Sequence, residues 1–420
     1  MYLFLVRAFN DIDHITPIVW KMWQDNYPVA LFCRSPDYDL HRDYRLRFLI
    51  KQGVKVNYIF DEFDQSLGFN HRMTRFIGRI CFAVANRLDH YSGTLFFAGL
   101  ATIQKRAKKL YKRSRGRFYD ISWPAVSLNK PGLRSYVLTM SNQSDMLSTF
   151  FYRQRTRKTV PTIALPHGVY LYTNQFVRIG SEEDSRYDKY HRFDHIITQN
   201  ELHRDVLSRA GLDRNRINVL GSVRCCNEWM TQYKMILPRA MTINTSGSNV
   251  IKAVFMTTRF AYRIDKKRML RTFELLSGTE GFETLVKPHT RSGKEAKVYD
   301  NMPLANVAKF SSVELCEWAD VVMVIGSSIL IEPLKQGKPV LYLKYLHENT
   351  TQYEELGACW TIHDETELKD ALISLRNDKK KVPYSEESVT RFLCEIIYGG
   401  QCERDVLGDY ENFIVSHARK

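Results

Sequence analysis

The chain has 420 residues, of which 44% are hydrophobic and 12% aromatic. This length and apolar content predict a folded protein of about two domains and exclude a disordered chain. Lysine and arginine outnumber aspartate and glutamate by 61 to 46, which gives a formal net charge of +15. Such an excess indicates an acidic partner, namely a phosphorylated ligand, a nucleic acid or an anionic membrane surface, and its sign does not choose among them.

The first part of the chain alternates apolar strands with helices. Residues 2–7, 29–33 and 54–59 are predicted to be strands, and residues 17–23 and 44–51 to be helical. This alternation predicts a doubly wound parallel sheet. The opening apolar run is too short for a signal peptide, so we expect it to be the first buried strand.

A polar turn is predicted over residues 9–14, after the first strand. It carries Asp11, Asp13 and His14. Ligands of parallel α/β sheets bind at the carboxyl ends of the strands, so these side chains are candidates for acceptor binding or for a general base. The alternative is a helix cap with a solvated histidine, and the sequence leaves both open.

Residues 70–92 and 94–117 have the period of amphipathic helices, and the second ends in eight basic residues between Lys105 and Arg117. Such a helix can dock on an anionic membrane surface. The alternative is an ordinary solvated helical face. The apolar run of residues 94–103 is too short to span a bilayer.

Four further strands are predicted at residues 136–139, 162–165, 195–198 and 218–220. His167 directly follows the second of them, so its imidazole is expected at the strand end. It is a candidate catalytic base or phosphate ligand, and a structural hydrogen-bonding histidine is the alternative.

A second series of α/β units is predicted after a linker near residues 230–249. Its first strand, at 250–256, is followed by Arg259, and its second, at 283–286, by Lys287, His289 and Arg291. Cationic side chains grouped in this way can hold a diphosphate without a metal. A solvated basic loop is the alternative.

The stretch from 321 to 343 predicts a strand, a tight turn, a helix and a second strand. Gly326 allows close approach of the backbone to a phosphate, and Ser327 and Ser328 can cap the helix and donate hydroxyls. Glu332 follows about one turn later, where a carboxylate can take ribose hydroxyls. An ordinary crossover with a serine cap is the alternative.

The eight cysteines lie mostly in apolar segments without CxxC spacing. This pattern favours reduced core thiols over disulfides or zinc sites, as in a cytoplasmic protein.

Two α/β domains with basic and serine-rich strand ends resemble a glycosyltransferase of the GT-B type. The motif Gly326-Ser327-Ser328-x-x-x-Glu332 is similar to the donor-phosphate helix of these enzymes and of the related UDP-N-acetylglucosamine 2-epimerases. Other strand ends resemble those of the CDP-glycerol glycerophosphotransferase family and of capsule or surface-polysaccharide transferases: Leu165-Pro166-His167-Gly168, Gly221-Ser222-x-Arg224 and Lys287-Pro288-His289. The Lys287-x-His289 element, paired with Ser327-Ser328, is also similar to bacterial sialyltransferases and Kdo transferases, which use CMP-activated sugars.

The resemblance implies roles for these residues. His289, Ser327 and Ser328 would bind the donor phosphate, Glu332 the ribose, and His167 would act on the acceptor side. Arg259, Lys287, Arg291 and Gly326 complete the expected donor site, while Asp13, His14, Asp11 and His167 are the candidate bases. No DxD-type motif stands at a predicted strand end, so we expect no metal and no cofactor.

Three parts are expected: an acceptor domain at residues 1–235 with the basic helices at 70–117, a nucleotide-donor domain at 250–385, and a C-terminal segment at 386–420 that crosses back onto the first domain. The expected function is inverting transfer of a sugar or glycerophosphate from a nucleotide-activated donor, CMP- or CDP-linked, to a glycan or lipid-linked acceptor. The expected location is cytoplasmic, with peripheral contact to an anionic membrane and no nucleic acid partner. The alternatives are a UDP-sugar 2-epimerase and a non-catalytic polyanion-binding protein.

Overall fold

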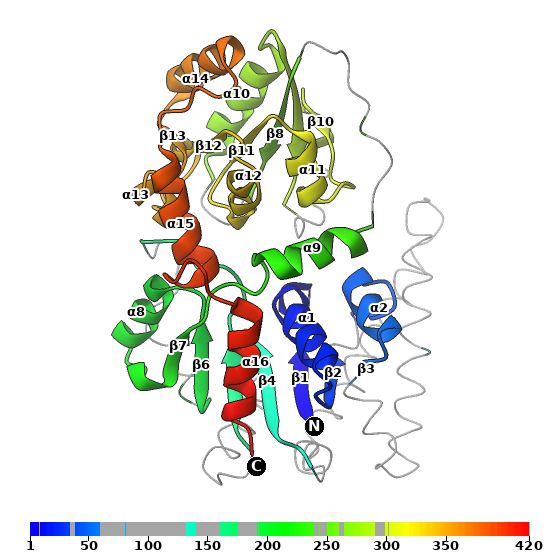
Figure 1. The fold of residues 1–420 in the computed structure, drawn as a ribbon. Coiled ribbons are helices and arrows are strands. Elements are labelled where there is room, and N and C mark those ends of the chain that lie inside the picture. Colours follow the sequence, from blue (N-terminus) through cyan, green and yellow to red (C-terminus); the bar gives the residue numbers. More distant parts are fainter. Residues whose placement is uncertain are drawn as a thin grey trace. The chain divides into compact units, whose positions relative to one another are not determined.

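Two parallel sheets organise the protein (Figure 1). The computed structural model describes residues 1–7, 9–33, 38–58, 80, 132–139, 160–174, 191, 193–238, 243, 250–259, 264–289, 299–300 and 302–419. Within these residues, one sheet has seven strands in the order β3-β2-β1-β4-β5-β6-β7, and the other has six in the order β10-β9-β8-β11-β12-β13. The predicted fold class of two Rossmann-like α/β domains is confirmed.

The chain divides into two compact units. The first comprises Met1–His167, Lys189–His195 and Phe413–Lys420, and the second comprises Gly168–Asp188 and Ile196–Asn412. Each unit is therefore assembled from segments that are far apart in the sequence.

The first unit is built around β1, whose five residues are all buried. Tyr2 of β1 pairs with Val29 of β2 on one side and with Ser135 of β4 on the other, in parallel register. Parallel strands covered on both faces need continuous apolar runs, which explains their sequence. The elements that begin in this unit are β1 (Tyr2–Val6), α1 (Phe9–Gln24), β2 (Val29–Cys33), α2 (Tyr44–Lys51), β3 (Lys55–Tyr58), β4 (Ser135–Thr139), β5 (Thr162–Leu165) and β6 (His195–Thr198).

The second unit contains the six-stranded sheet with the helices around it, and also α8 and β7, of which β7 is the last strand of the seven-stranded sheet. Its elements are α8 (Glu201–Arg209), β7 (Ile217–Val219), α9 (Asn227–Ile236), β8 (Ile251–Met256), α10 (Lys266–Ser277), β9 (Phe282–Lys287), β10 (Ala305–Asn306), α11 (Ser312–Trp318), β11 (Val321–Val324), α12 (Ile331–Lys335), β12 (Val340–Leu343), α13 (Gln352–Glu355), β13 (Trp360–Ile362), α14 (Glu365–Asn377) and α15 (Glu386–Tyr398). Short 3-10 helices cover Arg214–Arg216, Ser328–Leu330 and Lys344–Leu346. The last helix, α16 (Val406–Ser416), runs across the division into the first unit.

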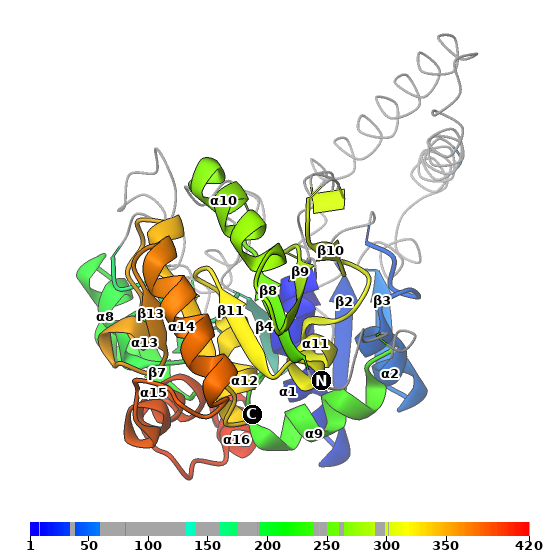
Figure 2. The ribbon, with the colours of Figure 1, turned by 90° about the horizontal axis from the view of Figure 1, so that it is seen from above.

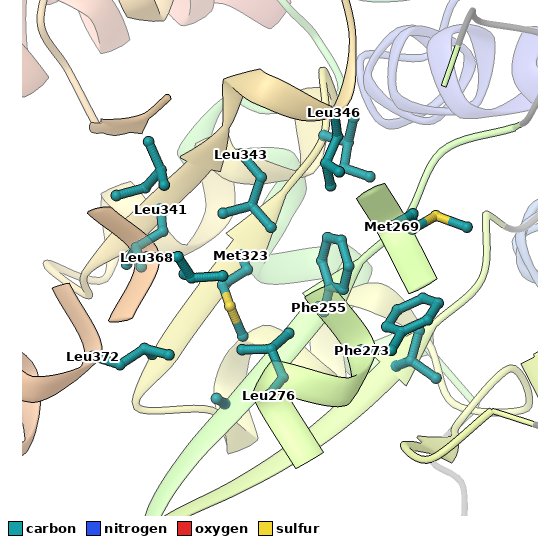
Figure 3. Packing of buried hydrophobic residues seen from close by; sticks show 14 of the residues in the cluster. Phe255, Met269, Phe273, Leu276, Met323, Leu341, Leu343, Leu346, Leu368 and Leu372 are labelled. Carbon is teal, nitrogen blue, oxygen red and sulfur yellow. The ribbon is translucent and has the colours of Figure 1, made fainter. Parts of the chain in front are cut away.

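The core of the second unit lies between the sheet and two helices. Phe273 of α10 and Leu372 of α14 pack against Phe255, Met323 and Leu341 of the strands (Figure 3). Viewed from above, α11 and α12 lie on the other side of these strands (Figure 2). Because helices cover both faces of the sheet, the loops that can bind a ligand lie at the carboxyl ends of the strands.

Two predicted boundaries are wrong. Residues 9–14 are not a polar turn, because α1 begins at Phe9 and includes them; Asp11 in its first turn accepts a hydrogen bond of 2.7 Å from the backbone N–H of Arg7. Such a contact satisfies a donor that the end of the strand leaves unpaired. The linker also starts later than Met230, since α9 continues to Ile236.

Helix α15 packs on the segment after β7. Gly221 has φ +84°, and a Cβ atom there would lie 2.3 Å from the carbonyl oxygen of Ile397. The backbone N–H of Ser222 donates to the same oxygen at 2.8 Å. The Gly221-Ser222 motif therefore provides the packing contact for helix α15.

The cysteine prediction is wrong at one pair, because Cys394 and Cys402 form a disulfide. Both residues flank the end of α15, where Gly399 adopts a left-handed conformation and turns the chain back. Spacing alone did not reveal the bond, since the turn that brings the two thiols together depends on two consecutive glycines. The other described cysteines, Cys33, Cys225, Cys226, Cys316 and Cys359, are not joined in disulfides.

In the part of the chain that the structure describes, no helix has the length and apolar character needed to span a membrane. The basic helices predicted at 70–117 lie outside the described residues apart from Ile80, so membrane docking stays a prediction.

Candidate functional site

In the first unit, an aspartate holds the imidazole of His167. Oδ1 of Asp11 lies 2.8 Å from Nδ1 of His167, and the aspartate side chain is 2% exposed while that of the histidine is 31% exposed. The contact joins α1 to the short segment that follows β5. A carboxylate on Nδ1 orients the ring and favours the tautomer in which Nε2 is the proton acceptor.

Asp13 has a different environment from Asp11, although both lie on α1. Its carboxylate contacts the guanidinium of Arg45, whose side chain is fully buried. The Nε atom of the same guanidinium donates to Asp43 at 3.0 Å, and its Nη1 donates to the carbonyl of Phe9 at 3.2 Å. Nearby carboxylates raise the pKa of Arg45 against the opposing effect of burial, so its charge persists. Asp13 thus belongs to a buried ion-pair cluster.

His14 is also buried in α1, at 2% exposure. Of the four candidate bases, the structure places Asp11 and His167 in contact, and it engages Asp13 with Arg45. Sequence reasoning missed Arg45 because it lies inside an ordinary amphipathic helix, 32 residues from its partner on α1.

In the second unit, three adjacent strands end in candidate donor-binding residues. β8 pairs with β9 on one side and with β11 on the other. The ends of these strands therefore bring Arg259, Lys287 and the Gly326 turn to one edge of the sheet. Arg259 is half-buried, and among the described residues its Nε atom is buried without a hydrogen-bond acceptor.

Lys287 is buried at the end of β9, and its Nζ atom donates to the carbonyl of Ala308 at 2.6 Å. Burial lowers the pKa of this ammonium to about 8, and the nearby Glu314 opposes the shift. His289 follows two residues later and is partly exposed. Arg291 lies outside the described residues, so its role stays a prediction.

The turn after β11 is tight. Gly326 has φ +51°, a conformation that side chains other than glycine rarely adopt, and a Cβ atom there would lie 3.0 Å from the Tyr172 hydroxyl and 3.2 Å from the His347 ring. Ser327 caps the short 3-10 helix that follows. Within the part of the chain that the structure describes, the backbone N–H groups of Ser327 and Ser328 meet no acceptor.

Glu332 is buried at the start of α12, and its Oε1 atom accepts from two side chains. Nζ of Lys234 and Nε2 of Gln336 each lie 2.9 Å away. Glu332 also lines a pocket together with Ser328, Arg224 and the aromatic side chains of Trp229 and Tyr233. The sequence does not single out Lys234, because it lies in the stretch near 230–249 that is predicted to be a linker.

Among the described residues, no group of three or more histidine, cysteine, aspartate or glutamate side chains is placed to hold a metal ion. The geometry instead offers backbone N–H groups and cationic side chains, which suit an anion.

No protein-family model matches the chain, and no curated protein matches its sequence. Solved structures match its fold. UDP-GlcNAc 2-epimerase from Neisseria meningitidis, bound to UDP-GlcNAc, aligns with TM-score 0.51 and 12% identity over 99% of each chain. MnaA of S. aureus with UDP aligns with TM-score 0.51 and 11% identity over 99% of this chain and 96% of the other. HepE of Anabaena, in complex with UDP and glucose, aligns with TM-score 0.52 and 10% identity over 99% of each chain. At these identities the likeness establishes the GT-B-like fold alone.

Proposed function

We propose that this chain is an enzyme acting on a nucleotide-activated sugar, and that the nucleotide diphosphate binds at the strand ends of the second unit. The observation that carries the proposal is the turn after Gly326, where the backbone N–H groups of Ser327 and Ser328 are unpaired in the described chain. Arg259 follows the neighbouring strand by three residues, and its side-chain Nε–H is buried without an acceptor among the described residues. Such donors favour a phosphate, whose charge strengthens each hydrogen bond.

Glu332 is the residue we assign to the ribose. Its contacts with Lys234 and Gln336 both use Oε1, so Oε2 is the atom we assign to a ribose hydroxyl. The aromatic side chains of Trp229 and Tyr233 line the same pocket and suit an apolar ring face. Lys287 and His289 lie at the end of β9, and each adds a positive charge and a hydrogen-bond donor there when it is protonated.

The reaction we propose begins with departure of the nucleoside diphosphate from the anomeric carbon. Cationic groups and backbone N–H groups stabilise the charge that develops on the leaving phosphate. Proton removal is assigned to Nε2 of His167, with Asp11 as the orienting group.

Two outcomes of this step are candidates. In a 2-epimerase, the base removes the proton at C2 as the C1–oxygen bond breaks, a proton then returns to the other face of C2, and the diphosphate rejoins C1, so no acceptor is needed. The likeness in fold to the N. meningitidis UDP-GlcNAc 2-epimerase supports this outcome. In a transferase, the base removes the proton of an acceptor hydroxyl on a glycan or a lipid-linked carrier. HepE, which has a similar fold, forms a complex with UDP and glucose, and this supports the transferase as the second candidate.

The test uses the purified full chain and needs two measurements. A thermal-shift screen with UDP, CDP, CMP, GDP and TDP should raise the melting temperature for one base, because a ligand of the folded state stabilises it. Incubation with UDP-GlcNAc in D₂O should then place deuterium at C2 without an acceptor if the chain is an epimerase. Release of nucleotide that requires an acceptor, with no deuterium at C2, would identify a transferase. No stabilisation by any of the nucleotides would contradict the proposed function.

A further inference from the structure

Residues 170–174, here called the strap, come three residues after His167 and are fastened to the loop of residues 348–352. Tyr172 and Thr351 form an antiparallel bridge. Further hydrogen bonds link the two segments: Thr173 N to Thr350 O at 3.1 Å, Gln352 N to Leu171 O at 2.8 Å, Thr350 N to Asn174 Oδ1 at 3.0 Å and Asn174 Nδ2 to Glu348 O at 3.2 Å. This dense bonding gives the strap a defined position in the second unit.

From this position the strap reaches the turn after β11. The Tyr172 hydroxyl donates to the carbonyl oxygen of Gly326 at 2.7 Å. A trans peptide is planar, so its C=O and its N–H point in opposite directions. Fixing the Gly326 carbonyl on the tyrosine side therefore directs the N–H of Ser327 to the opposite side of the peptide.

The ring of His347 borders the same turn, 3.2 Å from where a Cβ atom at Gly326 would lie, and it is kept neutral. Its Nδ1 atom accepts from the backbone N–H of Asn349 at 3.1 Å, and its Nε2 atom lies 3.0 Å from the Tyr342 hydroxyl. Burial and the nearby Lys344 lower the pKa of His347 to about 4. The histidine therefore shapes the turn and carries no positive charge at neutral pH. Among the described residues, the hydrogen bond from Tyr172 is the polar contact that orients the peptide.

We propose that Tyr172 is a positioning residue: its hydroxyl fixes the Gly326–Ser327 peptide with the N–H turned toward the diphosphate. The proposal rests on the proposed function, because it needs an anion at this turn. Without the hydroxyl, the Gly326 peptide is free to rotate, since a glycine with positive φ has more alternative conformations than any other residue. The cost falls on phosphate binding rather than on the nucleoside, whose contacts are assigned to Glu332 and the aromatic pocket.

The experiment compares Tyr172→Phe with Tyr384→Phe in the full chain. The control makes the same change at a hydroxyl of the same unit that also contacts the backbone, since Tyr384 accepts from the N–H of Val340 at 3.0 Å. Calorimetric titration measures the affinity of each variant for UDP and for uridine. We expect Tyr172→Phe to weaken UDP binding about five- to ten-fold and to leave uridine binding within two-fold. Tyr384→Phe should leave both affinities unchanged.

Three results would overturn the inference, and each has a separate meaning. Unchanged UDP affinity in Tyr172→Phe would show that the hydroxyl does not position the turn. Equal losses for UDP and uridine would show a general structural role. If the unaltered protein binds neither UDP nor uridine and the nucleotide screen is also negative, the proposed function fails, and the assignment of Tyr172 fails with it.

Discussion

Nδ1 of His167 and Oδ1 of Asp11 lie 2.8 Å apart and join the end of β5 to the first turn of α1. The carboxylate is almost wholly shielded from water, whereas the imidazole reaches the surface. A buried carboxylate is costly unless its hydrogen bonds are satisfied, and this one also accepts from the backbone of Arg7. The pair is therefore held in one geometry before any substrate arrives.

Asp11→Asn should lower the turnover number by about 10² to 10⁴-fold, because an amide can no longer stabilise the protonated ring of His167 or select its tautomer. UDP affinity should stay within two-fold of that of the unaltered protein, since the assigned nucleotide contacts are elsewhere. Steady-state kinetics and calorimetry measure the two effects. Asp39→Asn, at an exposed position of the same unit, is the control. A variant with undiminished turnover would exclude the pair from catalysis.

Arg45→Met should destabilise the protein by about 3 to 5 kcal/mol, because it leaves the carboxylates of Asp13 and Asp43 buried without a counter-charge. Urea unfolding followed by circular dichroism measures the change. Arg42→Met is the matched control, since that arginine is exposed and should contribute less than about 1 kcal/mol. Equal midpoints for the two variants would contradict the buried ion-pair cluster.

Lys287 should make the protein more stable as the pH rises from about 8 to 10. Its folded pKa of about 8 lies below that of an unfolded lysine, about 10.4. Below pH 8 the side chain is protonated in both states and the burial penalty is complete; above it, the folded state releases the proton first, so the free energy of unfolding increases. Denaturant titrations at several pH values should show that the free energy of unfolding rises with pH in the unaltered protein and does not rise in Lys287→Met. Identical pH profiles for the two proteins would contradict the lowered pKa.

Gly326→Ala and Gly337→Ala separate the cost of backbone conformation from the cost of contact. Both glycines have positive φ, but a Cβ atom at Gly337 would meet nothing within 4 Å, whereas at Gly326 it meets Tyr172 and His347. Gly337→Ala should cost about 1 to 2 kcal/mol from the backbone alone. Gly326→Ala should cost about 1 to 3 kcal/mol more and weaken UDP binding. Thermal unfolding and calorimetry measure these differences, and equal costs would argue against the tight turn.

Reduction of the Cys394–Cys402 disulfide should lower the free energy of unfolding by about 2 to 3 kcal/mol, as expected for a bridge that closes a short loop. Unfolding with and without dithiothreitol measures the effect. Cys402→Ala should start at the lower stability and show no response to the reductant. A response of the same size in that variant would place the effect at other thiols.

Much of the fold follows from local sequence patterns. Strands β2, β5 and β6 and helix α2 have the predicted bounds, because apolar runs of that length flanked by polar residues have few other solutions. The start of α1 was missed because Asn10, Asp11 and Asp13 favour turns in isolation, and the decisive contact, from Asp11 to His167, spans 156 residues. The contacts of Tyr172 with Gly326 and of Lys234 with Glu332 could not be predicted for the same reason. Neither Tyr172 nor Lys234 stands in a recognisable motif, and only the tertiary structure brings them to Gly326 and Glu332.

The division of the chain into its two units has a practical consequence for recombinant work. The polypeptide passes between the units after His167, after Asp188, after His195 and after Asn412. A gene cut in the region between α9 and β8 would therefore yield neither unit whole: the amino-terminal fragment would carry pieces of both, and the carboxyl-terminal fragment would take the last residues of the first unit with it. Complementation by two co-expressed fragments, rather than independent folding of either one, is the behaviour to expect from such a cut.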